Sequence, residues 1–340
     1  MYSDPNLLLE QTRASGDVLL SARDLTVQFP SQYGSIRAVD EVSFDIRAGE
    51  VISLVGESGC GKSTLGRAII GLLPNSAKIT GSLSYKGTEL VGLGHGKLTQ
   101  YRGTEMSMIF QEPMSSLNPV FRIGDQLGEA IQIRRARRRD KSENRSVREE
   151  VLEYLGQVKI NDPGKVIDRY PHELSGGMRQ RIMIAMSLAQ RPSLLIADEP
   201  TTALDVTTQA QILSLMSELT REYNMSLLFI THDLGVAGMI ASRIVVVYAG
   251  EIVEDSPVDD VFTETLHPYT KGLMASAPSS FKGDKRIEAI RGSMPNPTQT
   301  IMGCKFHERC PYVMDRCIET KPRLLDYGKD RKVRCFLYDA

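Results

Sequence analysis

A glycine-rich segment ending in Lys-Ser-Thr is the clearest candidate for chemistry in this sequence of 340 residues. It matches the pattern G-x-x-x-x-G-K-S/T, follows the apolar run VISLV at residues 51–55, and precedes a helix expected from about Lys62. Glycines let backbone N–H groups surround phosphate oxygens, Lys62 can neutralise the β- and γ-phosphates, and Ser63 can bind Mg²⁺. The alternative is a tight turn without a ligand. We predict a phosphate site made by Gly56, Ser58, Gly59, Cys60, Gly61, Lys62, Ser63 and Thr64.

Two adjacent carboxylates follow a second apolar run, at residues 194–197. A buried strand would deliver Asp198 and Glu199 at its carboxyl end, where parallel sheets commonly bind ligands. Asp198 would hold the Mg²⁺ hydration shell, and Glu199 would orient or deprotonate an attacking water. The alternative is a solvated strand end, which the phosphate loop makes the weaker interpretation.

A serine followed by two glycines opens another expected helix, at residues 179–190. Ser175, Gly176 and Gly177 would present a hydroxyl, backbone amides and a helix dipole to an anion. The alternative is an ordinary helix cap. One γ-phosphate rarely needs two phosphate-binding segments from the same chain, so the pattern favours two chains that complete each other's sites.

The elements that must position these residues alternate between strands and helices, which predicts an α/β fold. Strands are expected at 51–55, 106–110, 194–197, 226–230 and 244–247, and helices at 147–157 and 206–221. Strand character vanishes between about 113 and 190, which indicates an inserted helical subdomain. We expect a flexible N-terminus at 1–16, a main domain at 17–260, and an irregular Pro- and Gly-rich extension at 261–340.

Charge and hydropathy limit the partners. The chain has 41 basic and 42 acidic residues, so no net field attracts it to nucleic acid or anionic lipid. The basic run Arg134–Lys141 lacks interleaved aromatic residues, and we interpret it as a solvated helix end and loop. We find neither a secretory signal nor an apolar run of the roughly 18 residues that a membrane span requires. A cytosolic chain is expected, and transport would need separate membrane subunits.

Together these motifs resemble the ABC ATPases: Gly56–Thr64 is similar to Walker A, Leu194–Glu199 to Walker B, and Leu174–Met178 to the ABC signature. The resemblance implies an ABC nucleotide-binding domain, with a RecA-like P-loop core, a β-rich edge and a helical subdomain, that hydrolyses ATP with Mg²⁺. It also implies that Gln111 senses Mg²⁺ and the membrane partner, that Ala203-Leu204-Asp205 is the D-loop, and that His232 contacts the γ-phosphate. Phe29 would stack on adenine, with Tyr33 as its competitor.

Further segments, at 110–119 and 267–270 and around the terminal cysteines, resemble the dipeptide/oligopeptide/nickel branch of ABC importers, most of all the D-type ATPases of dipeptide permeases. This implies a peripheral protein at the cytoplasmic face of the inner membrane. Its partners would be two integral-membrane permease subunits, a second identical or related ATPase subunit, and an extracytoplasmic substrate-binding protein, with no nucleic acid. Nickel chelates or another small solute are alternative cargoes. A soluble ABC ATPase and a regulatory nucleotide-binding module are the rival classes.

The cysteines divide into two groups. Cys60 lies alone in the phosphate loop, where we interpret it as filling space and not as a nucleophile. Four others crowd the C-terminus, at Cys304, Cys310, Cys317 and Cys335. Disulfides are disfavoured in a reducing cytosol, and the spacing lacks the close pairs of zinc ribbons. The resemblance implies a four-iron four-sulfur cluster, with zinc or unligated thiols as alternatives.

Overall fold

The structure is a computed structural model that describes residues 16–32, 34–111, 116–138, 145–202, 204–276 and 290–339. The chain divides into two compact units: Met1–Leu93 with Leu228–Ala340, and Gly94–Leu227. We describe each unit separately. Some predictions fall outside the described residues: the N-terminal segment 1–15, Tyr33, the motif residues 112–115, the end of the basic run at 139–141, and Ala203.

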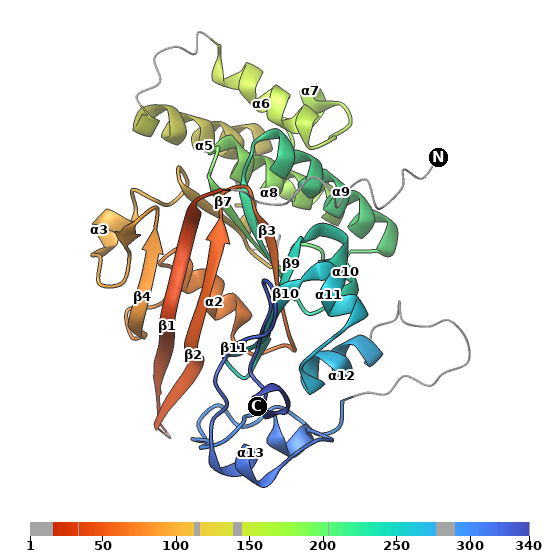
Figure 1. Ribbon diagram of the computed structural model, residues 1–340. Coiled ribbons are helices and arrows are strands. Elements are labelled where there is room, and N and C mark those ends of the chain that lie inside the picture. Colours follow the sequence, from red (N-terminus) through yellow and green to blue (C-terminus); the bar gives the residue numbers. More distant parts are fainter. Residues whose placement is uncertain are drawn as a thin grey trace. The chain divides into compact units, whose positions relative to one another are not determined.

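Strands dominate the first unit (Figure 1). An antiparallel sheet has the order β2-β1-β4-β5, and a second sheet contains the order β11-β12-β10-β9-β3-β8. The strands are β1 (Val18–Ser31), β2 (Gly34–Arg47), β3 (Val51–Val55), β4 (Lys78–Tyr85), β5 (Thr88–Glu89), β8 (Ser226–Thr231, which starts at the end of the second unit), β9 (Arg243–Tyr248), β10 (Glu251–Pro257), β11 (Leu325–Asp326) and β12 (Lys332–Val333).

Short helices complete this unit, and they are α2 (Lys62–Ile69), α10 (Leu234–Ile240), α11 (Val258–Thr263), α12 (Pro268–Ser276) and α13 (Asp315–Glu319). The apolar run of β3 pairs in parallel with β9, and every residue of β3 is buried. A strand covered on both faces needs such a continuous apolar sequence, as the sequence predicted. The long strands β1 and β2 lie side by side as antiparallel neighbours (Figure 1).

The C-terminal extension is joined to this unit by backbone and side-chain bonds. Its strand β12 pairs with β10, where Glu254 lies opposite Val333. The buried guanidinium of Arg334 donates to the carbonyl oxygens of Ile252 and Pro322, at 2.9 and 3.1 Å. Phe306, from the same extension, lies 2% exposed in a hydrophobic cluster with Val55, the last residue of β3. The extension therefore contributes to the hydrophobic core of the first unit, next to the strand that leads into the glycine-rich loop.

Helices dominate the second unit. They are α3 (His95–Leu98), α5 (Ile123–Arg138), α6 (Val147–Gln157), α7 (Pro163–Val166), α8 (Gly176–Ala189) and α9 (Val206–Glu222). Two strands, β6 (Met106–Ile109) and β7 (Leu194–Asp198), pair in parallel. Helix α6 begins with a capping box, in which Ser146 and Glu149 each accept from the other's backbone N–H. Among the described residues between 113 and 190, the α-helices are α5, α6, α7 and α8.

The basic run at the end of α5 is only partly the solvated helix end that we predicted, because Arg137 and Arg138 are exposed but Arg134 is buried. Arg134 is 2% exposed and donates to Glu150 at 2.6 Å, to the Tyr154 hydroxyl at 3.0 Å and to the Ala189 carbonyl at 3.0 Å. Its neighbour Arg135 also pairs with Glu150. The prediction was wrong for Arg134, because a helical charge pattern shows which residues are polar but not which of them meet partners on another helix. Arg134 and Arg135 therefore stabilise the packing of α5 against α6, and Arg134 also bonds to the last residue of α8.

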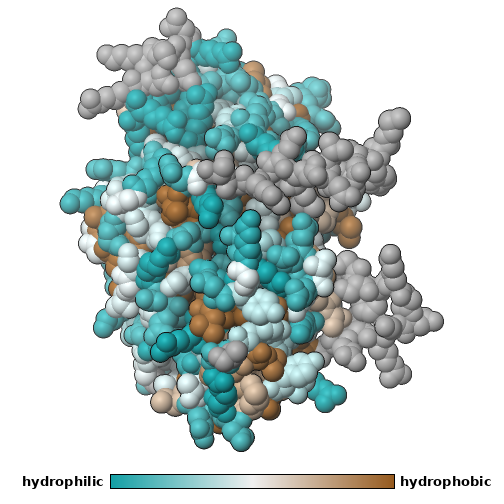
Figure 2. Space-filling view, viewed as in Figure 1, coloured by the Kyte–Doolittle hydropathy of each residue, from teal (hydrophilic) through white to brown (hydrophobic). Residues whose placement is uncertain are grey.

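Hydrophilic side chains cover most of the face shown in Figure 2, and hydrophobic side chains form separate small groups on it. Among the helices that the structure describes, none combines the length and the apolar character needed to cross a bilayer.

Arg134→Ala should lower the free energy of unfolding by about 3 to 5 kcal/mol, because it removes one partner of a buried, hydrogen-bonded ion pair. Arg145→Ala is the control, since Arg145 is 66% exposed in its pair with Glu153 and should cost about 1 kcal/mol or less. Urea unfolding followed by circular dichroism measures both. Equal losses in the two variants would contradict the structural role of Arg134.

Candidate nucleotide site

The glycine-rich loop connects β3 to α2 in the first unit. Gly61 is the N-cap of α2 and has a φ of 106°, in the left-handed region that favours glycine. A methyl group at Gly61 would overlap the carbonyl oxygen of Ala38, and one at Gly56 would overlap the carbonyl oxygen of Val247. The path of the loop therefore depends on close approach of its backbone to two neighbouring segments. Among the remaining loop residues, Ser58 and Gly59 are exposed, and Ser63 and Thr64 are half-buried in the first turn of α2.

Lys62, the first residue of α2, is only 4% exposed. Its ammonium group donates to the carbonyl oxygens of Gly56 at 2.8 Å and Glu57 at 2.9 Å. A cation inside the loop and the N-terminus of a helix both attract anions. The loop therefore fits the phosphates of a nucleotide.

Cys60 lies inside this loop and is 1% exposed. Burial raises the pKa of its thiol, so the group stays protonated near neutral pH. A buried, neutral thiol is a poor nucleophile. The geometry supports our interpretation of Cys60 as a residue that fills space.

Two other predicted residues of the first unit lie at the ends of strands. His232 is exposed directly after β8, and Asp233 then caps α10 by accepting from the N–H groups of Gly235 and Val236. Phe29 is half-buried near the end of β1, opposite Ile36 of β2. Their roles toward a nucleotide stay predictions.

In the second unit, Glu199 follows β7 and has a positive φ of 46°. Its carboxylate oxygen Oε2 accepts from the Gln111 amide at 3.1 Å and from the Thr202 hydroxyl at 2.9 Å. A left-handed backbone is uncommon for a glutamate and is often found at functional sites. No sequence pattern indicated this backbone conformation. The bond between Gln111 and Glu199 could not be predicted either, because the two residues are 88 positions apart. The neighbouring Asp198 is 1% exposed.

Ser175 and Asp205 each begin a helix of the second unit. Ser175 caps α8 by accepting from the N–H of Met178 at 3.3 Å, and Asp205 caps α9 by accepting from the N–H of Thr208 at 2.9 Å. Backbone and hydroxyl bonds from Thr208 lower the pKa of Asp205. Ser175 and the following Gly176 are exposed, and Gly177 is half-buried against Thr208. The cap that we weighed as an alternative is present, and it leaves the start of α8 open to solvent.

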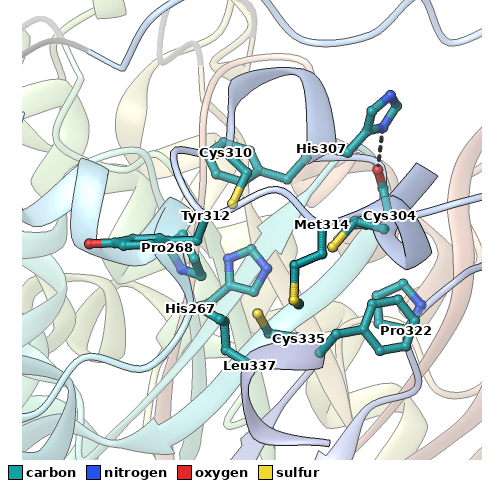
Figure 3. Close-up of a pocket in the computed structure, with 13 residues that line it drawn as sticks. His267, Pro268, Cys304, His307, Cys310, Tyr312, Met314, Pro322, Cys335 and Leu337 are labelled. Carbon is teal, nitrogen blue, oxygen red and sulfur yellow. Dashed lines mark hydrogen bonds between the residues drawn. The ribbon is translucent and has the colours of Figure 1, made fainter.

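The four C-terminal cysteines all line one small cavity. Figure 3 shows three of them, Cys304, Cys310 and Cys335, around it. Its volume is about 10 Å³, which is room for about one water molecule. In the described part of the chain, no group of three or more Cys, His, Asp and Glu side chains is arranged to hold a metal ion. These findings contradict our prediction that Cys304, Cys310, Cys317 and Cys335 hold a four-iron four-sulfur cluster.

Three of these cysteines, Cys304, Cys310 and Cys335, pack as protonated thiols. Burial raises the pKa of Cys304 to about 12, and it also raises the pKa of Cys310 and Cys335. The buried ring of His267 lines the same cavity, and burial lowers its pKa to about 3, so this imidazole is neutral. Cysteine spacing could not reveal the size of the space between the sulfur atoms, because that size depends on how the extension packs.

The chain resembles solved ATP-binding cassettes. A dimeric structure of the ATP-binding cassette MJ0796 bound to ADP and Pi matches with a TM-score of 0.62 and 28% identity, over 70% of this chain and 98% of that one. The cbiO1 protein of Clostridium perfringens matches with a TM-score of 0.60 and 25% identity, over 73% and 92%. The predicted fold class, an ABC nucleotide-binding domain, is confirmed.

The sequence is also similar to a particular group of ABC transporter proteins. The ABC transporter family model matches residues 39–202, and the model for the oligopeptide/dipeptide transporter C-terminal region matches residues 253–317. The oligopeptide transport ATP-binding protein AppD of Bacillus subtilis is 46% identical over 94% of this chain and 97% of its own length. The oligopeptide transport ATP-binding protein OppD of Salmonella typhimurium is 43% identical over 96% of each chain. The chain belongs to this family of ABC transporter ATP-binding proteins and is a transporter ATPase.

Gly61→Ala should weaken ATP binding at least about 100-fold, because a methyl group there overlaps the Ala38 carbonyl and the positive φ is strained for an alanine. Gly59→Ala is the matched comparison. It also has a positive φ, of 82°, but its methyl group would meet only the Met294 side chain, at an ordinary 3.5 Å. We expect a markedly smaller loss, measured by ATP titration of the full-length chain. Equal losses would show that backbone crowding at Gly61 is not the cause.

Proposed function

We propose that this chain is the ATP-hydrolysing subunit of an importer for dipeptides or oligopeptides. The observation that carries the proposal is the identity of 46% with an oligopeptide transport ATP-binding protein, which extends over 94% of the chain and so includes the extension as well as the cassette. The match of residues 253–317 to the peptide-transporter C-terminal region supports the same substrate class. The protein would work at the cytoplasmic face of the inner membrane, as a peripheral subunit.

The proposed roles in the first unit begin at the glycine-rich loop. Backbone N–H groups from Gly56 to Thr64 bind the phosphates, and Lys62 leaves the loop carbonyls to neutralise the β- and γ-phosphates. His232 contacts the γ-phosphate from the end of β8, and Phe29 stacks on the adenine. The buried position of Lys62 supports its role, because a cation away from bulk water interacts more strongly with an anion.

The proposed roles in the second unit concern water and metal. Glu199 orients or deprotonates the attacking water, and its bond to Gln111 supports a role for that glutamine in setting the carboxylate's position. Ser63, Asp198 and Gln111 carry the oxygen ligands that Mg²⁺ prefers, and the ion, when bound, neutralises charge on the phosphates. The proposed role of Asp205 in the D-loop is supported by its exposure at the start of α9.

The proposed partners follow from the same family. A second ATPase subunit, identical or related, would present its own Ser175, Gly176 and Gly177 to the nucleotide of this chain. The exposed start of α8 supports this arrangement, and the related cassette MJ0796 has been solved as a dimer. Two integral-membrane permease subunits would form the path for the peptide, and an extracytoplasmic binding protein would deliver it.

Peptides should stimulate the ATPase activity of the chain in a complex reconstituted with its permease subunits and binding protein. We expect di- to oligopeptides to stimulate ATP hydrolysis several-fold over the basal rate, because cargo delivery promotes closure of the two ATPase subunits. A series of peptides of increasing length, compared with a nickel chelate, measures this. Stimulation by the nickel chelate alone would contradict the peptide assignment.

Glu199→Gln should slow ATP hydrolysis by about 10² to 10⁴-fold while ATP binding is kept, because the amide cannot take a proton from water but leaves the phosphate contacts intact. Glu218→Gln is the control, since Glu218 lies on the same unit in an exposed pair with Lys159. Single-turnover hydrolysis and ATP titration separate the two effects. Hydrolysis at the wild-type rate would exclude Glu199 as the catalytic base.

A further inference from the structure

Glu57, the second residue of the glycine-rich loop, is bonded to the C-terminal extension through two different groups. Its backbone N–H donates to the hydroxyl of Tyr269 at 2.8 Å. Its carboxylate accepts two bonds from the guanidinium of Arg309, at 2.7 and 2.9 Å. Both partners lie more than 200 positions later in the chain. The carbonyl of Glu57 also accepts from Lys62, so one residue connects the extension to the lysine of the loop.

Arg309 is well placed to fix the position of this carboxylate. Its side chain is 5% exposed, whereas that of Glu57 is 31% exposed. The guanidinium donates further bonds to the Arg291 carbonyl at 2.9 Å and the Tyr248 hydroxyl at 3.3 Å, and it lies 5.9 Å from the centre of the Phe306 ring. The bond to Glu57 is the main cause that raises the pKa of Arg309. A planar guanidinium with two parallel bonds restricts the orientation of a carboxylate.

The segment that carries Arg309 is itself firmly packed. Phe306, three residues earlier, is 2% exposed and contacts the rings of Tyr248 and Tyr269, with centroids 5.1 and 5.5 Å away. Lys305 donates to Asp40 at 2.7 Å and to the Ala249 carbonyl at 2.9 Å. Asp40 lies two residues after Ala38, whose carbonyl meets Gly61. The extension thus contacts the loop at Glu57 and contacts the segment on which the loop packs.

We propose that Arg309 is a positioning residue of the nucleotide site, through which the C-terminal extension sets the conformation of the phosphate loop. The inference rests on the proposed function of that loop in binding ATP. A loop fixed before ATP arrives loses less conformational freedom on binding, and this increases affinity. Arg309 also offsets the negative charge of Glu57, which would otherwise repel the phosphates. Arg309 acts on ATP only through Glu57, so the effects of changing the two residues should depend on each other.

A double-mutant cycle tests this in the full-length chain, by ATP titration with EDTA present to prevent hydrolysis. Arg309→Ala should raise the Kd for ATP about tenfold in the wild-type background, but less than about threefold in a Glu57→Gln background, where the bidentate contact is already lost. Arg309→Lys should recover part of the affinity, because lysine keeps the charge without the bidentate geometry. Arg316→Ala is the matched control, since Arg316 lies in the same extension, pairs with Asp339 and stacks on Phe336. It should leave the Kd unchanged.

The melting temperature of each nucleotide-free variant distinguishes positioning from general stability. The proposal is overturned if Arg309→Ala weakens ATP binding equally in both backgrounds, or if it lowers the melting temperature without changing the Kd. If Arg309→Ala does not fold, Arg309→Lys in the same two backgrounds gives the same comparison. Lys62→Ala tests the phosphate site itself. If Lys62→Ala loses ATP binding while the Arg309 and Glu57 variants all bind ATP like the wild type, the proposed function stands and only this inference is removed. A wild-type chain that does not bind ATP would overturn both.

Discussion

The close approach of backbone to backbone around the glycine-rich loop is the constraint on which the candidate site depends. Gly61 meets the carbonyl of Ala38, and Gly56 meets that of Val247, so neither position has room for a side chain. Hydrogen bonds keep the same segments together, because Gly250 donates to the Cys60 carbonyl and Asp40 donates to the Gly250 carbonyl. A loop fixed on several sides can present its N–H groups to phosphates with little further ordering.

Charged groups in the first unit reinforce this arrangement. Lys305 and Lys321, both from the extension, converge on Asp40 and Glu251, and the lysine charges help to lower the pKa of Asp40 despite its burial. Each lysine satisfies carboxylates that would be costly to bury alone. Residues far apart in the sequence therefore stabilise the same small region. This explains why the segment after residue 260 is a structural part of the first unit although it contains little regular secondary structure.

In the second unit, the same principle applies to helices. Arg134 joins α5 to α6 and α8 through a buried ion pair and two further hydrogen bonds.

Glu199, in the same unit, has a left-handed backbone and bonds to Gln111 and Thr202. Strain of this kind persists only where surrounding contacts determine the conformation, and it is common at functional sites.

The sequence by itself determined the fold class, the main strands and helices, and the glycine-rich loop, because these depend on local patterns: continuous apolar runs, glycine positions and helix caps. Tertiary structure alone decided the burial of Arg134, the bond between Gln111 and Glu199, and the contact of Arg309 with Glu57. It also decided the size of the cavity between the four cysteines, which contradicted the predicted cluster. These features join residues that are distant in the chain, and spacing along a sequence carries no information about the distance between side chains that only packing brings together.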